Sequence, residues 1–154
     1  MVQFTPSMDR ILTLESGMKQ VSSQIKTDSS MLELLEGEYA LVSLPPETAL
    51  GFPVSGDLRI VIHDPVEITL IVLESAWLEM AAQYPLAKAQ HGYRAIRLSQ
   101  NFPLETVGVM AKLTQALAQA GVSIMAYSTF KSDVVLIRGY ELNQALAALW
   151  DLRF

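Results

Sequence analysis

The sequence predicts an α+β protein made of two successive modules with antiparallel sheets. Two runs rich in β-branched and aromatic residues, Val122–Thr129 and Asp133–Arg138, flank the short polar turn Phe130-Lys131-Ser132. That pattern is typical of a β-hairpin. A helical pattern precedes the hairpin and another follows it, and the first half of the chain shows a similar order of strands and helices.

Composition narrows the class of protein. The 154 residues suffice for one ordinary domain or two small modules on a shared core, and 51% are apolar while 18% are charged. The absence of cysteine excludes a disulfide framework, a thiolate metal site and a cysteine nucleophile. The net charge of -5 and the lack of a Lys/Arg cluster argue against nucleic-acid binding.

The mean hydropathy of +0.29 raises the question of a membrane span. The best candidate, Val107–Tyr127, is interrupted by Lys112 and by a helix-stopping Gly121. It therefore indicates an amphipathic helix that runs into a strand, because a span needs about 20 continuous apolar residues. No apolar segment follows basic residues at the N-terminus. We expect a soluble cytoplasmic protein that binds neither membrane nor nucleic acid.

The first half begins with a polar segment, residues 1–30, whose approximate helical stripe is interrupted by Gly17. We expect a helical extension or a partly disordered arm. Pro45–Leu50 allows at most one helical turn. The pattern then predicts four strands and one helix: Met31–Leu35, Tyr39–Leu44, Leu58–Ile62, Glu67–Leu73 and the helix Ala76–Gln83.

The second half begins with a predicted linker, Leu86–Gly92, and a strand, Tyr93–Ser99. Asn101-Phe102-Pro103 is expected to open a helix, since proline suits a first helical turn, and Gly121 is placed to end it. After the hairpin, a last helix is predicted from about Glu141 to Trp150, with Leu142, Leu146 and Leu149 turned inward.

The end of the chain has a consequence for the topology. A β-α-β-β-α-β module needs a strand after its second helix, and Asp151–Phe154 is too short to supply one. We therefore predict that Met31–Leu35 pairs into the sheet of the second half. The predicted organisation is an extension at 1–30, a first module at 31–85 and a second module at 92–154, with the two modules interlocked.

Several segments between Met31 and about Trp150 resemble the ACT domain, in particular the paired-ACT proteins that include cytosolic arginine sensors and uncharacterised bacterial relatives. The matching segments are Gly37-Glu38-Tyr39-Ala40, Leu44-Pro45-Pro46, Glu67 with Ile71-Val72, Gly108-Val109, and Ser128-Thr129-Phe130 with Asp133-Val134-Val135-Leu136-Ile137. The resemblance implies a ferredoxin-like fold and a regulatory protein. It also implies an amino-acid ligand bound between paired domains, and a homo-oligomer, a dimer or tetramer, whose sheets join side by side.

Carried over by position, the resemblance implies a ligand site at the start of the long helix and at the hairpin: Leu104, Glu105, Thr106, Val107, Gly108, Ser128, Thr129, Phe130 and Asp133. An α-carboxylate favours the N–H groups of a helix N-terminus. Asp133 and Glu105 are candidate acceptors for the α-ammonium. A purely structural interpretation of these residues stays open: in it, Asp133 only caps the hairpin turn and Gly108 only permits tight packing of the helix on the sheet.

Catalysis has little support in the sequence. His63 and His91 lie in separate turn-like segments, and no catalytic or nucleotide-binding motif is found. Asp64 and Glu67 are expected to be solvated. We expect no enzyme, no cofactor and no metal site. The alternative to an amino-acid sensor is an interaction or oligomerisation module without a ligand.

Overall fold

The computed structural model describes residues 32–51, 59–99, 105–150 and 152. The chain divides into two compact units, residues 1–30 and residues 31–154. The expected N-terminal extension at 1–30 lies outside the described residues. The fold given below is that of the second unit.

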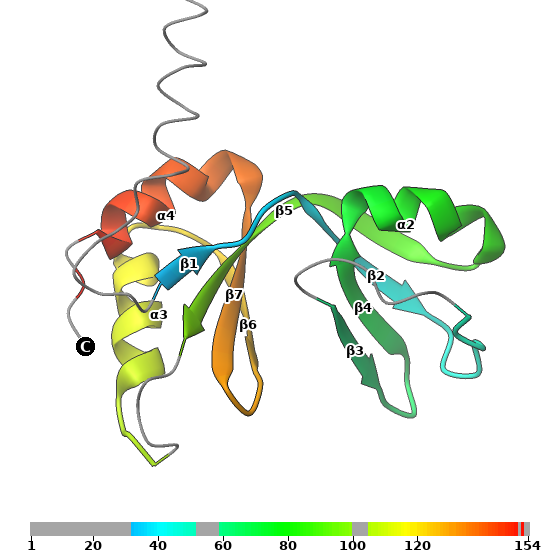
Figure 1. Ribbon diagram of the computed structural model, residues 1–154, viewed down its shortest axis with the longest axis horizontal. Helices are drawn as coiled ribbons and strands as arrows, with labels where there is room; N and C mark the ends of the chain where they lie inside the picture. The colour runs from blue at the N-terminus through cyan, green and yellow to red at the C-terminus, as the bar shows by residue number, and fades with distance from the viewer. Residues whose placement is uncertain (1–31, 52–58, 100–104, 151, 153–154) are drawn as a thin grey trace, which may run out of the picture. The chain divides into compact units, whose positions relative to one another are not determined.

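The described residues form a seven-stranded antiparallel sheet in the order β3-β4-β2-β5-β7-β6, with β1 paired to β5 (Figure 1). The strands are β1 Leu32–Leu34, β2 Tyr39–Leu44, β3 Ile60–His63, β4 Ile68–Leu73, β5 Lys88–Ser99, β6 Ile124–Ser128 and β7 Ser132–Arg138. The helices are α2 Glu74–Met80, α3 Val109–Gln119 and α4 Leu142–Leu149. Short 3₁₀ turns extend α2 through Ala81–Gln83 and precede α4 at Gly139–Glu141.

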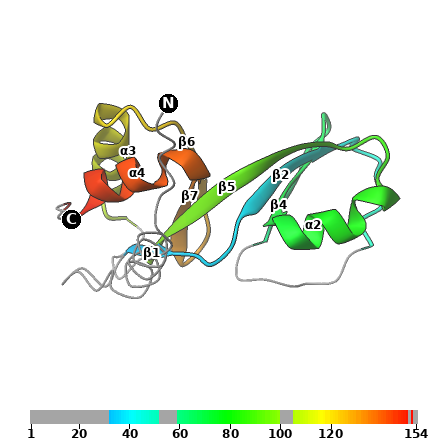
Figure 2. The same cartoon turned by 90° about the horizontal axis from the view of Figure 1, so that it is seen from above.

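Strand β5 belongs to both modules (Figure 2). Its first part pairs with β2, from Ser43 opposite Lys88 to Tyr39 opposite Tyr93. Its last part pairs with β1 on that same side, while residues 93–99 pair with β7 on the other. The predicted linker Leu86–Gly92 is therefore wrong from Lys88 onward. The polar Lys88 and Gln90 flank Ala89, which packs in the core, so these residues form a half-buried strand.

The prediction that the first strand pairs into the second module is confirmed. In β1, Leu32 lies opposite Leu98 and Leu34 opposite Ile96. The guanidinium of Arg97 donates to the carboxylate of Glu33 across the same pair of strands at 3.1 Å. Strand β1, from the first half of the chain, thus joins the sheet of the second module, and the two modules interlock.

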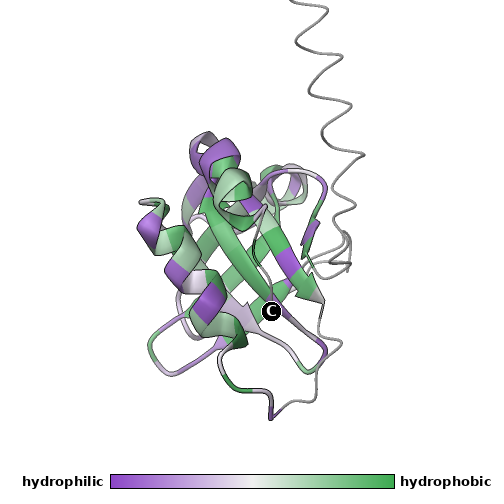
Figure 3. Ribbon diagram, turned by 90° about the vertical axis from the view of Figure 1, so that its left-hand side faces the viewer, coloured by the Kyte–Doolittle hydropathy of each residue, from purple (hydrophilic) through white to green (hydrophobic). Residues whose placement is uncertain are grey.

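Each module carries its helices on one face of its part of the sheet. In the first module, α2 packs Trp77 and Met80 on β2 and β4; in the second, α3 and α4 pack on β5 and β7. The helix-free faces of both modules share a third core: Leu35, Tyr39, Ile71, Tyr93, Ala95, Val134 and Leu136. The strands are mostly apolar, whereas the helices alternate apolar and polar residues (Figure 3).

The ends of α3 differ in how well the sequence predicts them. At its C-terminus, the N–H of Val122 donates to the carbonyl of Leu117, and Gly121 adopts a φ of 70°, which confirms a glycine stop. At its N-terminus, the expected opening at residues 101–103 lies outside the described residues. Residues 105–108 form a turn, and Gly108 has a φ of 93°, which a right-handed helix does not allow. The helix therefore begins only at Val109.

Candidate functional site

The predicted site residues at the start of the long helix lie before α3 rather than in its first turn. Leu104 is outside the described residues. Glu105, Thr106 and Val107 are exposed, and the side chain of Val107 is 95% exposed. Gly108 is the residue that precedes the first helical turn, and the space where its Cβ would stand is open to a distance of 4 Å.

The amino end of α3 carries backbone hydrogen-bond donors. No side chain forms a capping hydrogen bond at Gly108 in the described part of the chain. The N–H groups of Val109, Met110 and Ala111 have no partner within the helix, because the first turn has no preceding carbonyl groups. These donors, together with the helix dipole, are suited to a carboxylate.

The hairpin turn satisfies much of its own hydrogen bonding. The N–H of Thr129 donates to the carbonyl of Ser132 at 2.8 Å, and the hydroxyl of Thr129 donates to the same carbonyl at 2.9 Å. The N–H of Ser132 donates back to the Thr129 hydroxyl at 3.1 Å. The Thr129 side chain therefore stabilises the turn, whereas Phe130 beside it is 78% exposed.

Asp133 is buried at the first step of the hairpin ladder. It lies opposite Ser128 on β6 and opposite Leu98 on β5, its side chain is 4% exposed, and it has an interaction partner within the fold. Because side chains alternate along a strand, Asp133 shares the face of β7 with Val135, which packs in the core under α3 and α4. Asp133 and Ser128 thus lie on the helix-bearing face, next to the hairpin turn. The turn between β6 and β7 lies at the end of the module where α3 begins (Figure 1).

A polar cleft that the sequence did not predict lies between the helix-free faces of the two modules. Its volume is about 380 Å³. Tyr127 of β6 contributes one wall. The rest of the lining comes from β2, from β4 with the residue before it, and from the start of β5: Leu41, Val42, Ser43, Glu67, Thr69, Lys88, Ala89 and Gln90. Thr69, Ser43 and Lys88 form a row across β4, β2 and β5, since Ser43 lies opposite both of the others.

Hydrogen bonds within the cleft fix the carboxylate of Glu67. The carboxylate of Glu67 accepts hydrogen bonds from the hydroxyl of Ser43 and, at 3.2 Å, from that of Thr69. Glu67 is half-buried, so the expectation that it is solvated is wrong, because the cleft places it under these hydroxyls. Asp64 is exposed and accepts from the N–H groups of Val66 and Glu67, which lowers the pKa of its carboxyl.

Gln90 links the cleft to residues of the second module through hydrogen bonds. Its side-chain carbonyl accepts from the guanidinium of Arg138 at 2.6 Å and from the hydroxyl of Tyr93 at 2.8 Å. The same guanidinium lies 4.2 Å from the centroid of the Tyr93 ring, within the range of a cation–π interaction. The side chain of Gln90 is thereby fixed in orientation.

The phenol of Tyr127 makes the stability of the fold depend on pH in the alkaline range. Burial raises the pKa of its phenol above the ordinary value of 10.0, and the neighbouring Tyr93 raises it further. Since the folded state holds this proton more tightly than the unfolded state does, the free energy of unfolding is expected to fall as pH rises above about 10. Denaturant titrations at a series of alkaline pH values measure this loss.

Tyr127→Phe is expected to remove that part of the decrease, and Tyr140→Phe, at a side chain that is 84% exposed, to leave it in place. A parallel loss of stability in wild type and Tyr127→Phe would show that other groups cause the decrease.

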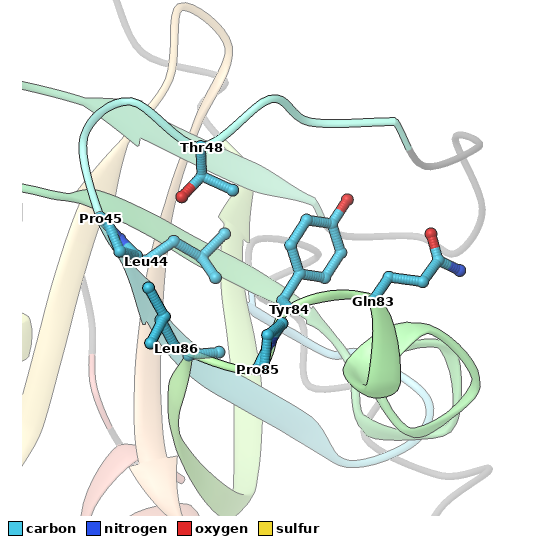
Figure 4. Close-up of a pocket in the computed structure, with 8 residues that line it drawn as sticks. Leu44, Pro45, Thr48, Gln83, Tyr84, Pro85 and Leu86 are labelled. Carbon is cyan, nitrogen blue, oxygen red and sulfur yellow. The ribbon is translucent and has the colours of Figure 1, made fainter.

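A second, apolar pocket of about 170 Å³ lies at the end of β2 (Figure 4). Leu44, Pro45 and Thr48 line one side, and the segment from Gln83 to Ala87 lines the other. The hydroxyl of Tyr84 accepts a hydrogen bond from the N–H of Gly51 at 3.3 Å. By topology this is the counterpart in the first module of the start of α3, but its lining offers few polar groups for a charged ligand.

The described residues contain no group of three or more His, Asp or Glu side chains placed to hold a metal ion. None of their helices combines the length and the apolar character needed to cross a membrane.

Comparisons with known proteins agree with this fold. Residues 88–151 match the ACT domain family. No curated protein matches the chain by sequence. The fold resembles that of protein Atu0741 from Agobacterium tumefaciens, with a TM-score of 0.67 at 20% identity over 78% of this chain and 86% of that one.

Two further solved structures share the fold. Protein VC0802 from Vibrio cholerae, described as of unknown function, gives a TM-score of 0.61 at 21% identity over 79% of this chain and 88% of that one. The regulatory subunit of aspartate kinase from Thermus thermophilus, in its ligand-free form, gives 0.55 at 18% identity over 79% and 95%. At these identities the likeness establishes the fold. Residues 88–151 thus carry the sequence match to the ACT domain family, and the described chain as a whole has a fold like that of these paired modules.

Proposed function

We propose that this protein is a regulatory protein that binds a free amino acid and responds through the packing of its paired ACT-like modules. The family match at residues 88–151 supports a ligand-binding regulatory role. The likeness in fold to a regulatory subunit of aspartate kinase supports the same role, since that protein is a separate regulatory chain. The proposal assigns no catalytic step to this chain, so the regulated activity would belong to a partner.

The observation that carries the proposal is that the amino end of α3 has no side-chain cap among the described residues, in a module where Ser128 and Asp133 share the helix-bearing face. The N–H groups of Val109 to Ala111 would bind the α-carboxylate of the ligand. Asp133 or Glu105 would accept from its α-ammonium, and Ser128 would orient it. Gly108 has no side chain, so it does not obstruct the approach of a ligand to these N–H groups.

A second copy of the chain would complete this site. Val107 and Phe130 are apolar, are 95% and 78% exposed, and belong to the segments that precede α3 and close the hairpin. Isolated exposed apolar residues are common, but a pair on the segments of a proposed ligand site suits a subunit contact. Ligand bound there would favour one packing of two subunits over another. The competing proposal, an assembly module without a ligand, requires the contact and not the amino acid.

A thermal-shift screen of the purified chain against the twenty amino acids tests the proposal. A ligand that binds only the folded state stabilises it by RT ln(1 + [L]/Kd), or about 2.7 kcal/mol at 100 times Kd. Asp133→Asn keeps the shape of the side chain and removes its charge, so it is expected to abolish the response. Glu79→Gln, an exposed carboxylate on α2, serves as the matched control. A response that is unchanged in Asp133→Asn would refute this site, and a flat screen of a folded oligomer would favour the assembly module.

A further inference from the structure

We infer that the polar cleft between the helix-free faces is a second ligand site, and that it takes a zwitterionic amino acid with an apolar side chain. The cleft holds one carboxylate, Glu67, and one ammonium group, Lys88, and its other lining groups are neutral. It uses none of the residues at the start of α3 or on the hairpin turn. Either site would therefore stand if the other failed.

The two charges of the cleft are arranged for a ligand that bears both signs. In the described part of the chain, Glu67 and Lys88 do not pair with each other, and the ion pairs found there involve other residues. Thr69, Ser43 and Lys88 lie side by side on three adjacent strands, which places the Cα atoms of the outer two about 10 Å apart. The carboxylate of Glu67 is hydrogen-bonded to the hydroxyls at the Thr69–Ser43 end of this row, and Lys88 stands at the other end, so the two ends of a zwitterion would each meet one charge.

Glu67 is preoriented to receive the α-ammonium. The hydroxyls of Ser43 and Thr69 hold its two carboxylate oxygens in place. An ionised carboxylate has about four lone-pair sites, so two hydrogen bonds leave capacity for an ammonium donor. Because the group is half-buried, such a charge-assisted hydrogen bond is screened less than it would be at the surface.

Lys88 and Gln90 would bind the α-carboxylate. Arg138 and Tyr93 both donate hydrogen bonds to the side-chain carbonyl oxygen of Gln90, so its amide nitrogen remains as a donor for a ligand. Within the described residues, neither that nitrogen nor the ammonium of Lys88 has a hydrogen-bond partner. The two donors lie on neighbouring positions of the same face of β5, since one residue separates them.

The remaining lining selects the ligand side chain. Leu41 and the ring of Tyr127 are apolar and come from opposite modules. Both charged groups of the cleft are used by the backbone ends of the ligand, so a charged ligand side chain would find no partner. A cavity of about 380 Å³ is within the range of small-molecule sites and accommodates leucine or methionine. A ligand that touches both modules would also hold their helix-free faces together.

Calorimetric titration with L-leucine and L-methionine tests the inference. N-acetyl-L-leucine lacks the ammonium that Glu67 needs, and L-leucine amide lacks the carboxylate that Lys88 needs. Both blocked forms are expected to bind at least ten-fold more weakly than leucine, and so are Glu67→Gln and Lys88→Met with leucine itself. Glu38→Gln and Lys112→Met change exposed charges outside the cleft and should leave binding unchanged. Methyl resonances of Leu41 and Thr69 should shift on titration.

The outcomes separate this site from the one at the hairpin. Leucine binding that survives Glu67→Gln and Lys88→Met but is lost in Asp133→Asn would overturn the inference and favour the hairpin site. Binding that survives Asp133→Asn and is lost in both cleft variants would support the cleft alone. Equal binding of N-acetyl-L-leucine, or unshifted Leu41 and Thr69 methyl groups at saturation, would refute it even if a cleft variant failed to fold.

Discussion

Leu35→Ala is expected to lower the free energy of unfolding by about 3 kcal/mol, within the range of 2–5 kcal/mol found for buried leucines. Leu35 is 2% exposed and packs in the core that both helix-free faces share. Its N–H donates to the carbonyl of Ala95 at 2.9 Å, next to the pairing of β1 with β5. Because this core belongs to both modules, we expect one cooperative transition, with the melting temperature lowered by roughly 6–12 °C.

Hydrogen exchange read out by mass spectrometry distinguishes a loss of stability in both modules from a loss confined to one of them. Protection should fall in β4 and in β7 alike. Leu78→Ala makes the same chemical change at a side chain on α2 that is 63% exposed, and it should be nearly neutral. Two separate unfolding transitions, or a loss of protection confined to the second module, would contradict the interlocked fold.

The sequence predicts the sheet well where a strand is continuously apolar or where the order of predicted elements suggests a pairing. Tyr39–Leu44 reads as a buried strand and is one, since β4 and β5 flank it on both sides. The pairing of Met31–Leu35 with the second module is expected from the order of predicted elements and is confirmed by the register of Leu34 opposite Ile96. Both arguments rest on the need to bury apolar groups and to satisfy backbone hydrogen bonds.

Other features depend on tertiary context and are hidden in the sequence. Lys88–Gly92 looks like a linker because its core residue, Ala89, is small and its neighbours are polar. The late start of α3 depends on the positive φ of Gly108, which glycine permits but does not require. Local pattern cannot determine either.

The candidate sites show the same division. The family resemblance predicted one site formed by the start of α3 and the hairpin. The structure adds that Asp133 is buried on the helix-bearing face. The cleft was missed because Glu67 and Lys88 are far apart in the sequence and each looks like an ordinary solvated charge. Its only local signal is the alternation that puts Ser43 and Thr69, two polar side chains in apolar strands, on one face.

Trp77→Ala is expected to cost about 3–5 kcal/mol, the range for large aromatic residues in a core, and to act mainly on the first module. Trp77 is 3% exposed and stacks on Tyr84 with ring centroids 6.1 Å apart. In the described residues, the helical cover of this module consists of α2 and its 3₁₀ extension, whereas α3 and α4 share that role in the second module.

Loss of Trp77 therefore removes the main apolar contact of α2 with the sheet. We expect hydrogen exchange to accelerate in β3 and β4 more than in β6 and β7, which reports opening of part of the fold below the global unfolding energy. Trp150→Ala removes a tryptophan that is 55% exposed and should have a small effect. Equal acceleration in all four strands would mean that the shared core couples the modules so tightly that the first cannot open alone. That outcome would also make the cleft between them a rigid site, whereas selective opening would let a ligand in the cleft stabilise the first module.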